Sequence, residues 1–144
     1  MLTIIIPTLN AENILKKTLN RVQAYAWEDV EVLVVDGGSQ DQTLHVARGF
    51  QATVITSPAG RGQQLALGAQ TARGPWMLFL HADTQLPPDW DLHIGKFMSA
   101  HRSTERAAYF RLAFDDDSSG SNRVTILANW RAQNLGLPYG DQGL

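Results

Sequence analysis

What this sequence lacks already excludes several classes of protein. No cysteine occurs in its 144 residues, so neither a disulfide framework nor a thiolate metal site is possible, which fits a reducing compartment. No apolar run approaches the ~20 residues needed to cross a bilayer, and the start "MLTIIIPTLN" has no basic region typical of a signal peptide. Twelve basic against fourteen acidic residues leave a formal charge of -2, so we expect no nucleic-acid partner. These absences predict a soluble, cytoplasmic protein.

The common nucleotide-binding fingerprints are also missing. The turn after the first apolar run, "PTLNAEN", contains no glycine, so the G-x-G-x-x-G pattern of dinucleotide-binding proteins is absent. The chain contains no Walker A pattern either. His45, His93 and His101 fall in expected helices without a matching ligand set, so no zinc motif is supported. A nicotinamide enzyme, a P-loop NTPase and a zinc enzyme are therefore all disfavoured.

The sequence does contain short apolar runs rich in β-branched residues. They are nearly continuous rather than alternating, which is typical of strands covered on both faces, and they span Leu2–Ile6, Val30–Val35, Ala52–Thr56 and Trp76–Leu80. Helical periodicity or helix-start signals mark the segments Asn13–Tyr25, Ser39–Arg48, Gly62–Arg73 and Asp89–Ala100. This alternation predicts an α/β fold with a Rossmann-like, open, doubly wound, mainly parallel sheet and helices on both faces.

The rhythm of the chain changes after residue 100. Ala107–Phe114 predicts a further strand, the acidic run Asp115–Asp117 a solvated turn, and Val124–Asn134 a helix. No repeat or linker is visible, so residues 1–144 are predicted to form one domain. The chain stops at the glycine-rich "PYGDQGL" with no closing element, and we therefore expect it to be truncated on its C-terminal side.

Chemically useful side chains gather directly after the expected strands. In an open α/β sheet, ligands bind outside the carboxyl ends of the strands, so these segments belong to one predicted edge. Asp36 in "VVDGGS" is one example: it could accept a hydrogen bond from a base or a ribose, or form an Asx turn into the next helix. From the residues alone, both alternatives stay open.

Arg61 and Asp83 carry the same ambiguity. Arg61 in "SPAGRGQQLALGA" lies between glycines before a helix, where it could meet a diphosphate or remain solvated surface. Asp83 follows the fourth apolar run, where it could be a ligand of a divalent ion or a turn residue before Pro87 and Pro88. His81 is ambiguous, because a histidine at a strand end is more often packed than a ligand and Mg²⁺ prefers oxygen.

Taken together, these segments resemble the GT-A glycosyltransferases of family 2. "TIIIPTLNAEN" resembles the family's opening S-I-I-P-x-x-N-E, "VEVLVVDGGSQDQT" resembles E-I-I-V-V-D-D-G-S-x-D-x-T, and "WMLFLHADTQLPP" occupies the place of its D-x-D strand end. The combination with "GRGQQLALGA" and "PYGDQGL" is similar to a bacterial branch of the family. Two departures stand out: Gly37 replaces the second Asp of V-D-D-G-S, and His81 replaces the first Asp of D-x-D.

The resemblance implies a role for each matching residue. A nucleotide would be bound by Pro7, Thr8, Asn10, Glu12, Asp36, Gly38, Ser39, Arg61 and Ala82, with Arg61 near the diphosphate. Asp83 would bind Mg²⁺ or Mn²⁺. Asp141, preceded here by Gly140 rather than by the family's usual Glu, falls at the place of the acceptor-side catalytic base.

The activity implied is inverting transfer of a sugar from a nucleotide-diphosphate sugar to an acceptor hydroxyl, assisted by the metal. The sequence does not identify the acceptor, and peripheral membrane association could reside in the missing C-terminal part. Two alternatives remain. The reduced D-x-D motif is compatible with a non-catalytic nucleotide-sugar-binding domain. A sugar nucleotidyltransferase is less well supported, because its glycine-rich basic loop after the first strand is absent.

Overall fold

A computed structural model describes residues 1–23, 29–100, 106–114 and 119–135. The chain alternates strands and helices up to residue 100 and adds a longer helix near its end. In chain order the elements are β1 (Leu2–Thr8), α1 (Glu12–Gln23), β2 (Val30–Asp36), α2 (Thr43–Gly49), β3 (Thr53–Thr56), α3 (Arg61–Thr71), β4 (Trp76–Phe79), α4 (Trp90–Ala100) and α5 (Ser119–Leu135). None of the described helices is long and apolar enough to span a membrane.

The four strands form one parallel sheet in the order β3-β2-β1-β4. β1 is central, and its Leu2 lies opposite Val30 of β2 on one side and Trp76 of β4 on the other. The buried central strands explain why the apolar runs are continuous rather than alternating. The strand order reverses between β1 and β4, which is where ligands bind in open α/β sheets.

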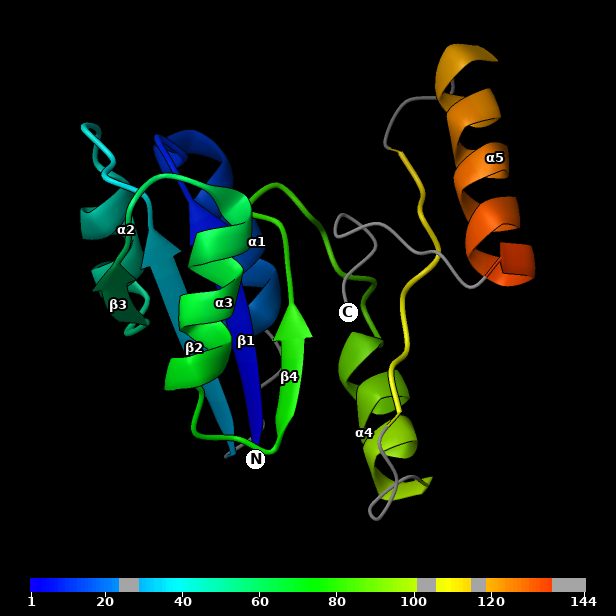
Figure 1. The fold of residues 1–144 in the computed structure, drawn as a ribbon, viewed down its shortest axis with the longest axis horizontal. Helices are drawn as coiled ribbons and strands as arrows, with labels where there is room; N and C mark the ends of the chain where they lie inside the picture. The colour runs from blue at the N-terminus through cyan, green and yellow to red at the C-terminus, as the bar shows by residue number, and fades with distance from the viewer. Residues whose placement is uncertain (24–28, 101–105, 115–118, 136–144) are drawn as a thin grey trace.

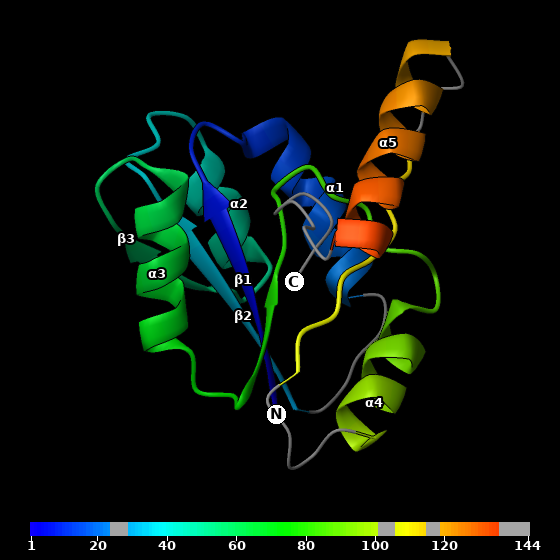
Figure 2. The ribbon, with the colours of Figure 1, turned by 45° about the vertical axis from the view of Figure 1, so that its right-hand side comes forward.

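Alternate residues of the central strands supply the two sides of the core. Ile4 and Ile6 pack with α1 residues such as Leu15, whereas Ile5 packs on the opposite side with Leu65 of α3. Figure 1 shows α3 on the near face of the sheet and α1 and α2 on the far face, and Figure 2 shows the same layers from another side. The predicted α/β fold with helices on both faces is therefore confirmed.

One helix begins later than its sequence predicted. The expected start at Ser39 is wrong, because α2 begins at Thr43. Ser39 and Asp41 instead use their side chains to hold the preceding turn and the neighbouring loop: the Ser39 hydroxyl donates to Asp36 and accepts from Asn10 N, and Asp41 accepts from Glu12 N. The other helices overlap their predicted segments, except that Tyr25, the expected end of the first, lies outside the described residues.

The predicted strand at Ala107–Phe114 is wrong, because residues 107–114 have no strand structure. The Leu112 amide donates to Asn129 Oδ1 over 2.9 Å, and Asn129 Nδ2 donates back to the Leu112 carbonyl over 3.0 Å. A side chain of α5 thus pairs the backbone groups that a neighbouring strand would otherwise pair. The predicted turn at Asp115–Asp117 lies outside the described residues.

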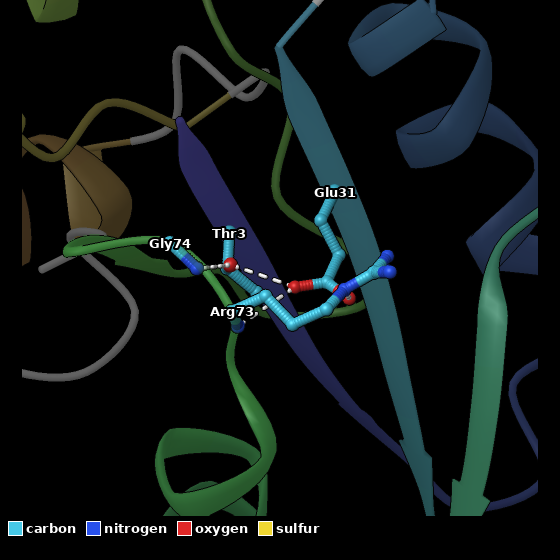
Figure 3. A network of polar contacts seen from close by, with 4 residues as sticks. All are labelled: Thr3, Glu31, Arg73 and Gly74. Atoms are coloured by element: carbon cyan, nitrogen blue, oxygen red, sulfur yellow. Dashed lines mark hydrogen bonds and ion pairs between the residues drawn. The ribbon is translucent and has the colours of Figure 1, made fainter.

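A buried carboxylate joins three segments at the edge of the sheet where the strands begin (Figure 3). Glu31 Oε2 accepts from the Thr3 hydroxyl over 2.9 Å, and the Arg73 Nε donates to Glu31 Oε1 over 2.7 Å. Gly74 N donates to Thr3 Oγ1 over 3.0 Å. Burial alone would raise the pKa of Glu31, but hydrogen bonds from Arg73 and Thr3 outweigh it and hold the pKa below its ordinary value of 4.5.

Glu31→Gln is expected to lower the free energy of unfolding at pH 7 by about 1–3 kcal/mol, because it removes the charge that these donors bind. A depressed folded-state pKa contributes stability above the unfolded pKa and loses it as the pH falls through the folded pKa. The difference in the free energy of unfolding between wild type and variant should therefore shrink below pH 4.5. Urea unfolding followed by circular dichroism measures it.

Asp29→Asn is the matched control for this measurement. Asp29 lies at the same edge of the sheet, where the strands begin, and pairs with the amino terminus over 2.6 Å, but its side chain is 69% exposed. Exposed ion pairs contribute about 0–1 kcal/mol, so this variant should unfold nearly like the wild type. An equal loss in both variants would contradict the role given to Glu31.

Candidate functional site

The carboxyl edge of the sheet collects the predicted site residues that the structure describes. β1 ends at Thr8 and β2 at Asp36, which lie opposite each other in the parallel register. Arg61 begins α3, and His81 to Asp83 follow β4 on the other side of β1. Asp141 lies outside the described residues.

Asp36 is almost completely buried, with 1% of its surface exposed. Its Oδ1 accepts from the hydroxyls of Thr8 and Ser39, over 3.1 and 2.5 Å. Its Oδ2 accepts from the amides of Gly38 and Ser39, over 2.9 and 2.8 Å. Burial would raise the pKa of Asp36, but these hydrogen bonds, led by those from Ser39, hold it below its ordinary value. The carboxylate therefore forms the Asx turn that the sequence left open, and its contact with a nucleotide stays a prediction.

Hydrogen bonds from side chains join the loops after β1 and β2 to each other. Asn10 N donates to Ser39 Oγ over 2.8 Å, and Asn10 Oδ1 accepts from Gln40 N over 2.8 Å. Glu12 Oε2 accepts from Gln42 N over 2.7 Å. Asn10 adopts a positive φ of 50° at this junction, a conformation that asparagine tolerates well. Asn10 and Glu12, both predicted to bind a nucleoside, thus also hold the loops after β1 and β2 together.

Sequence reasoning missed two further residues that join these loops, Asp41 and Thr43. The Ala11 amide donates to Thr43 Oγ1 over 2.8 Å, and Thr43 itself donates to Asp41 Oδ1 from its amide over 3.0 Å and from its hydroxyl over 2.5 Å. Asp41 Oδ2 also accepts from Glu12 N over 3.2 Å. The signal was present, because Asp41 and Thr43 match the D-x-T of the resemblance.

Gln64 of α3 is a further residue that was missed. Only 4% of it is exposed, and its Nε2 donates to the carbonyls of Thr8 and Val35 over 2.8 and 2.7 Å. A Cβ on Gly37 would lie 3.3 Å from Gln64 Nε2 and 3.3 Å from Ala59 Cα. The buried glutamine thus leaves little room for a side chain at position 37, where the family pattern has an aspartate.

Arg61 and Asp83, predicted as separate features, are brought together by His81. The Arg61 guanidinium lies 2.5 Å from His81 Nε2, and His81 Nδ1 contacts Asp83 Oδ1. Ala82 between them is buried, and its carbonyl accepts from the Thr18 hydroxyl over 2.6 Å. A cation from α3 and a carboxylate from the β4 loop therefore meet at one place on the carboxyl edge.

The Asp83 carboxylate fits a divalent cation whose other ligands come from a bound anion and from water. Within the described part of the chain, no group of three His, Cys, Asp or Glu side chains could hold a metal ion by itself. Asp83 is 58% exposed, and its Oδ2 accepts no hydrogen bond from the described residues. Mg²⁺ characteristically takes one or two carboxylates plus phosphate oxygens and water, so one open carboxylate is compatible with it.

Comparison with known proteins decides the family. A family model described as glycosyl transferase family 2 matches residues 3–136. The chain belongs to this family. A relative of this family 2 chain, the PGL/p-HBAD biosynthesis glycosyltransferase of Mycobacterium bovis (strain BCG / Pasteur 1173P2), is 34% identical over 113 residues. The match covers 73% of this chain and 44% of the relative, so the chain spans less than half of that protein's length.

Solved structures support the fold of this family 2 chain. The crystal structure of S. aureus TarS 1-349 matches with a TM-score of 0.62 at 22% identity, covering 80% of this chain and 40% of that one. A mannosyltransferase from Pyrobaculum calidifontis in complex with GDP-Man and Mn²⁺ matches with a TM-score of 0.60 at 25% identity, covering 68% and 32%. The GT-A fold implied by the sequence resemblance is confirmed.

Proposed function

We propose that this family 2 chain is the donor-binding part of an inverting glycosyltransferase. It would bind a nucleotide-diphosphate sugar and a divalent metal, Mg²⁺ or Mn²⁺, and transfer the sugar to an acceptor hydroxyl. The observation that carries the proposal is the meeting of Arg61, His81 and Asp83 at the carboxyl edge beside β1. The mannosyltransferase neighbour in complex with GDP-Man and Mn²⁺ supports this choice of ligands.

Each proposed role follows from the chemistry of the side chain. Asp83 would hold the cation together with the donor diphosphate, and the cation would lower the charge of that diphosphate. The Arg61 guanidinium would donate hydrogen bonds to phosphate oxygens and stabilise the negative charge that develops on them. The rim formed by Pro7, Thr8, Asn10, Glu12, Gly38, Ser39 and Ala82 would contact the nucleotide, with Asp36 keeping the turn in shape.

The chemical step is a displacement at the anomeric carbon. The acceptor hydroxyl oxygen forms a bond to that carbon, its proton passes to the Asp141 carboxylate, and the bond to the diphosphate oxygen breaks on the opposite side. Arg61 then faces the departing diphosphate. The acceptor and the nucleotide base are left open by this proposal.

Isothermal titration calorimetry with UDP and with GDP tests donor binding. We expect at least one nucleotide to bind, and to bind more tightly with Mn²⁺ or Mg²⁺ than with EDTA. If neither nucleotide binds under any of these conditions, the proposal fails.

A non-catalytic nucleotide-sugar-binding domain is the second candidate, and the single open carboxylate at the β4 end favours it. Turnover of a nucleotide sugar by a longer form of the chain would separate the two functions. A catalytic chain should hydrolyse or transfer the donor sugar and lose this turnover in Asp141→Asn. Retained turnover in that variant would rule out Asp141 as the base.

A further inference from the structure

The imidazole of His81 lies between a group that can only donate hydrogen bonds and a group that accepts them. Arg61 approaches Nε2 over 2.5 Å, and Asp83 Oδ1 contacts Nδ1. A guanidinium has no acceptor, so Nε2 must present its lone pair to Arg61. The ring proton then sits on Nδ1 and is donated to the Asp83 carboxylate. The contacts thus assign the acceptor role to Nε2 and the donor role to Nδ1 of His81.

A carboxylate at this position, as in the family's D-x-D pattern, would form a different arrangement. It could accept from Arg61, but it has no hydrogen to donate to Asp83, and its charge would repel that of Asp83. An imidazole satisfies both neighbours because its two nitrogens have opposite hydrogen-bonding roles. The departure from the family pattern at His81 therefore has a consequence: it couples Arg61 to Asp83.

We propose that His81 is a positioning residue that holds the Arg61 guanidinium and the Asp83 carboxylate at a fixed spacing for one nucleoside diphosphate and its divalent cation. This inference rests on the proposed function. The two groups come from separate elements, the first residue of α3 and the loop after β4. In the described residues only His81 bonds to both, so it sets their relative placement before any ligand arrives.

The two ring nitrogens can be replaced one at a time. The amide of His81→Asn can donate to Asp83 from about the place of Nδ1, but it is too short to reach Arg61. The amide oxygen of His81→Gln can accept from Arg61 near the place of Nε2, but it leaves Asp83 without its donor. The two variants therefore separate the arginine contact from the aspartate contact.

Calorimetry with UDP and GDP should show this separation. His81→Asn is expected to weaken nucleotide binding in EDTA about three- to tenfold while keeping the enhancement by Mn²⁺, since it releases only Arg61. His81→Gln is expected to keep the affinity in EDTA and to reduce the enhancement by Mn²⁺ about three- to tenfold. In the Arg61→Ala background, His81→Asn should cause no further loss in EDTA, because the two changes remove one shared contact.

His93→Asn is the matched control. His93 Nε2 pairs with Asp89 over 3.0 Å on the exposed surface of α4. Its replacement should therefore change neither the nucleotide affinity in EDTA nor the enhancement by Mn²⁺. Equal behaviour of His81→Asn and His81→Gln, or of both and the wild type, would overturn the inference.

Nitrogen-15 NMR of the imidazole tests the pairing without any nucleotide. The ligand-free protein should show a coupling across the hydrogen bond between the Arg61 guanidinium and His81 Nε2. Absence of that coupling would overturn the inference even if nucleotides bind. Failure of the wild type to bind any nucleotide would instead overturn the proposed function, and the nitrogen spectrum would separate the two failures.

Discussion

Asp83→Asn is expected to remove the metal-dependent part of nucleotide binding while leaving binding in EDTA unchanged. The asparagine keeps an acceptor for His81 Nδ1, so the pairing at the strand end survives, but the negative charge that a divalent cation requires is lost. Replacing residues that only support metal ligands already costs about 10–100-fold in metal affinity, so a direct ligand should cost at least as much. We therefore expect the nucleotide dissociation constant in Mn²⁺ to rise by about 10–100-fold.

Asp89→Asn provides the matched control for this experiment. Asp89 also pairs with a histidine, and its side chain is 56% exposed, against 58% for Asp83. It lies before α4 rather than directly after β4, so its replacement should leave the calorimetric titration with Mn²⁺ unchanged. If Asp83→Asn binds nucleotide in Mn²⁺ as tightly as the wild type, Asp83 does not hold the metal.

Gly68→Ala should destabilise the fold by about 2 kcal/mol, even though alanine is the better helix former. A Cβ at this position would lie 2.4 Å from Ile5 Cγ2 and 3.2 Å from Val35 Cγ2. Both neighbours are completely buried in the central strands, so neither can move without disturbing the sheet. The free-energy cost of overpacking exceeds the gain of about 1 kcal/mol in helix propensity. The melting temperature should therefore fall by roughly 6 °C.

Gly62→Ala on the same helix separates packing from propensity. A Cβ there would meet nothing within 4 Å, so only the helix propensity changes. We expect this variant to be stabilised by about 0.4–1 kcal/mol, measured by the same thermal and urea unfolding. Stabilisation of both variants would mean that α3 does not pack closely on β1 at Gly68.

Much of the fold follows from local patterns. The continuous apolar runs identified the four strands of the described sheet. In the central strands β1 and β2, burial on both faces leaves no polar alternation in the sequence. The helices between them were found from periodicity. The segment Ala107–Phe114 shows the limit of this reasoning, since its apolar character does not show whether a neighbouring strand or the side chain of Asn129 pairs its backbone.

The location of the candidate site was equally accessible from the sequence, because the carboxyl ends of parallel strands must share one edge. The sequence by itself therefore determined the family, the sheet and the edge at which Asp36, Arg61 and Asp83 gather. The partners of those side chains were decided only by the tertiary structure. Asp36 accepts from Thr8 of the neighbouring strand as well as from its own turn, and buried Gln64 lies against Gly37. His81 lies 20 residues after Arg61 in the chain and joins it to Asp83, and such a contact depends on how α3 and β4 pack rather than on any local pattern.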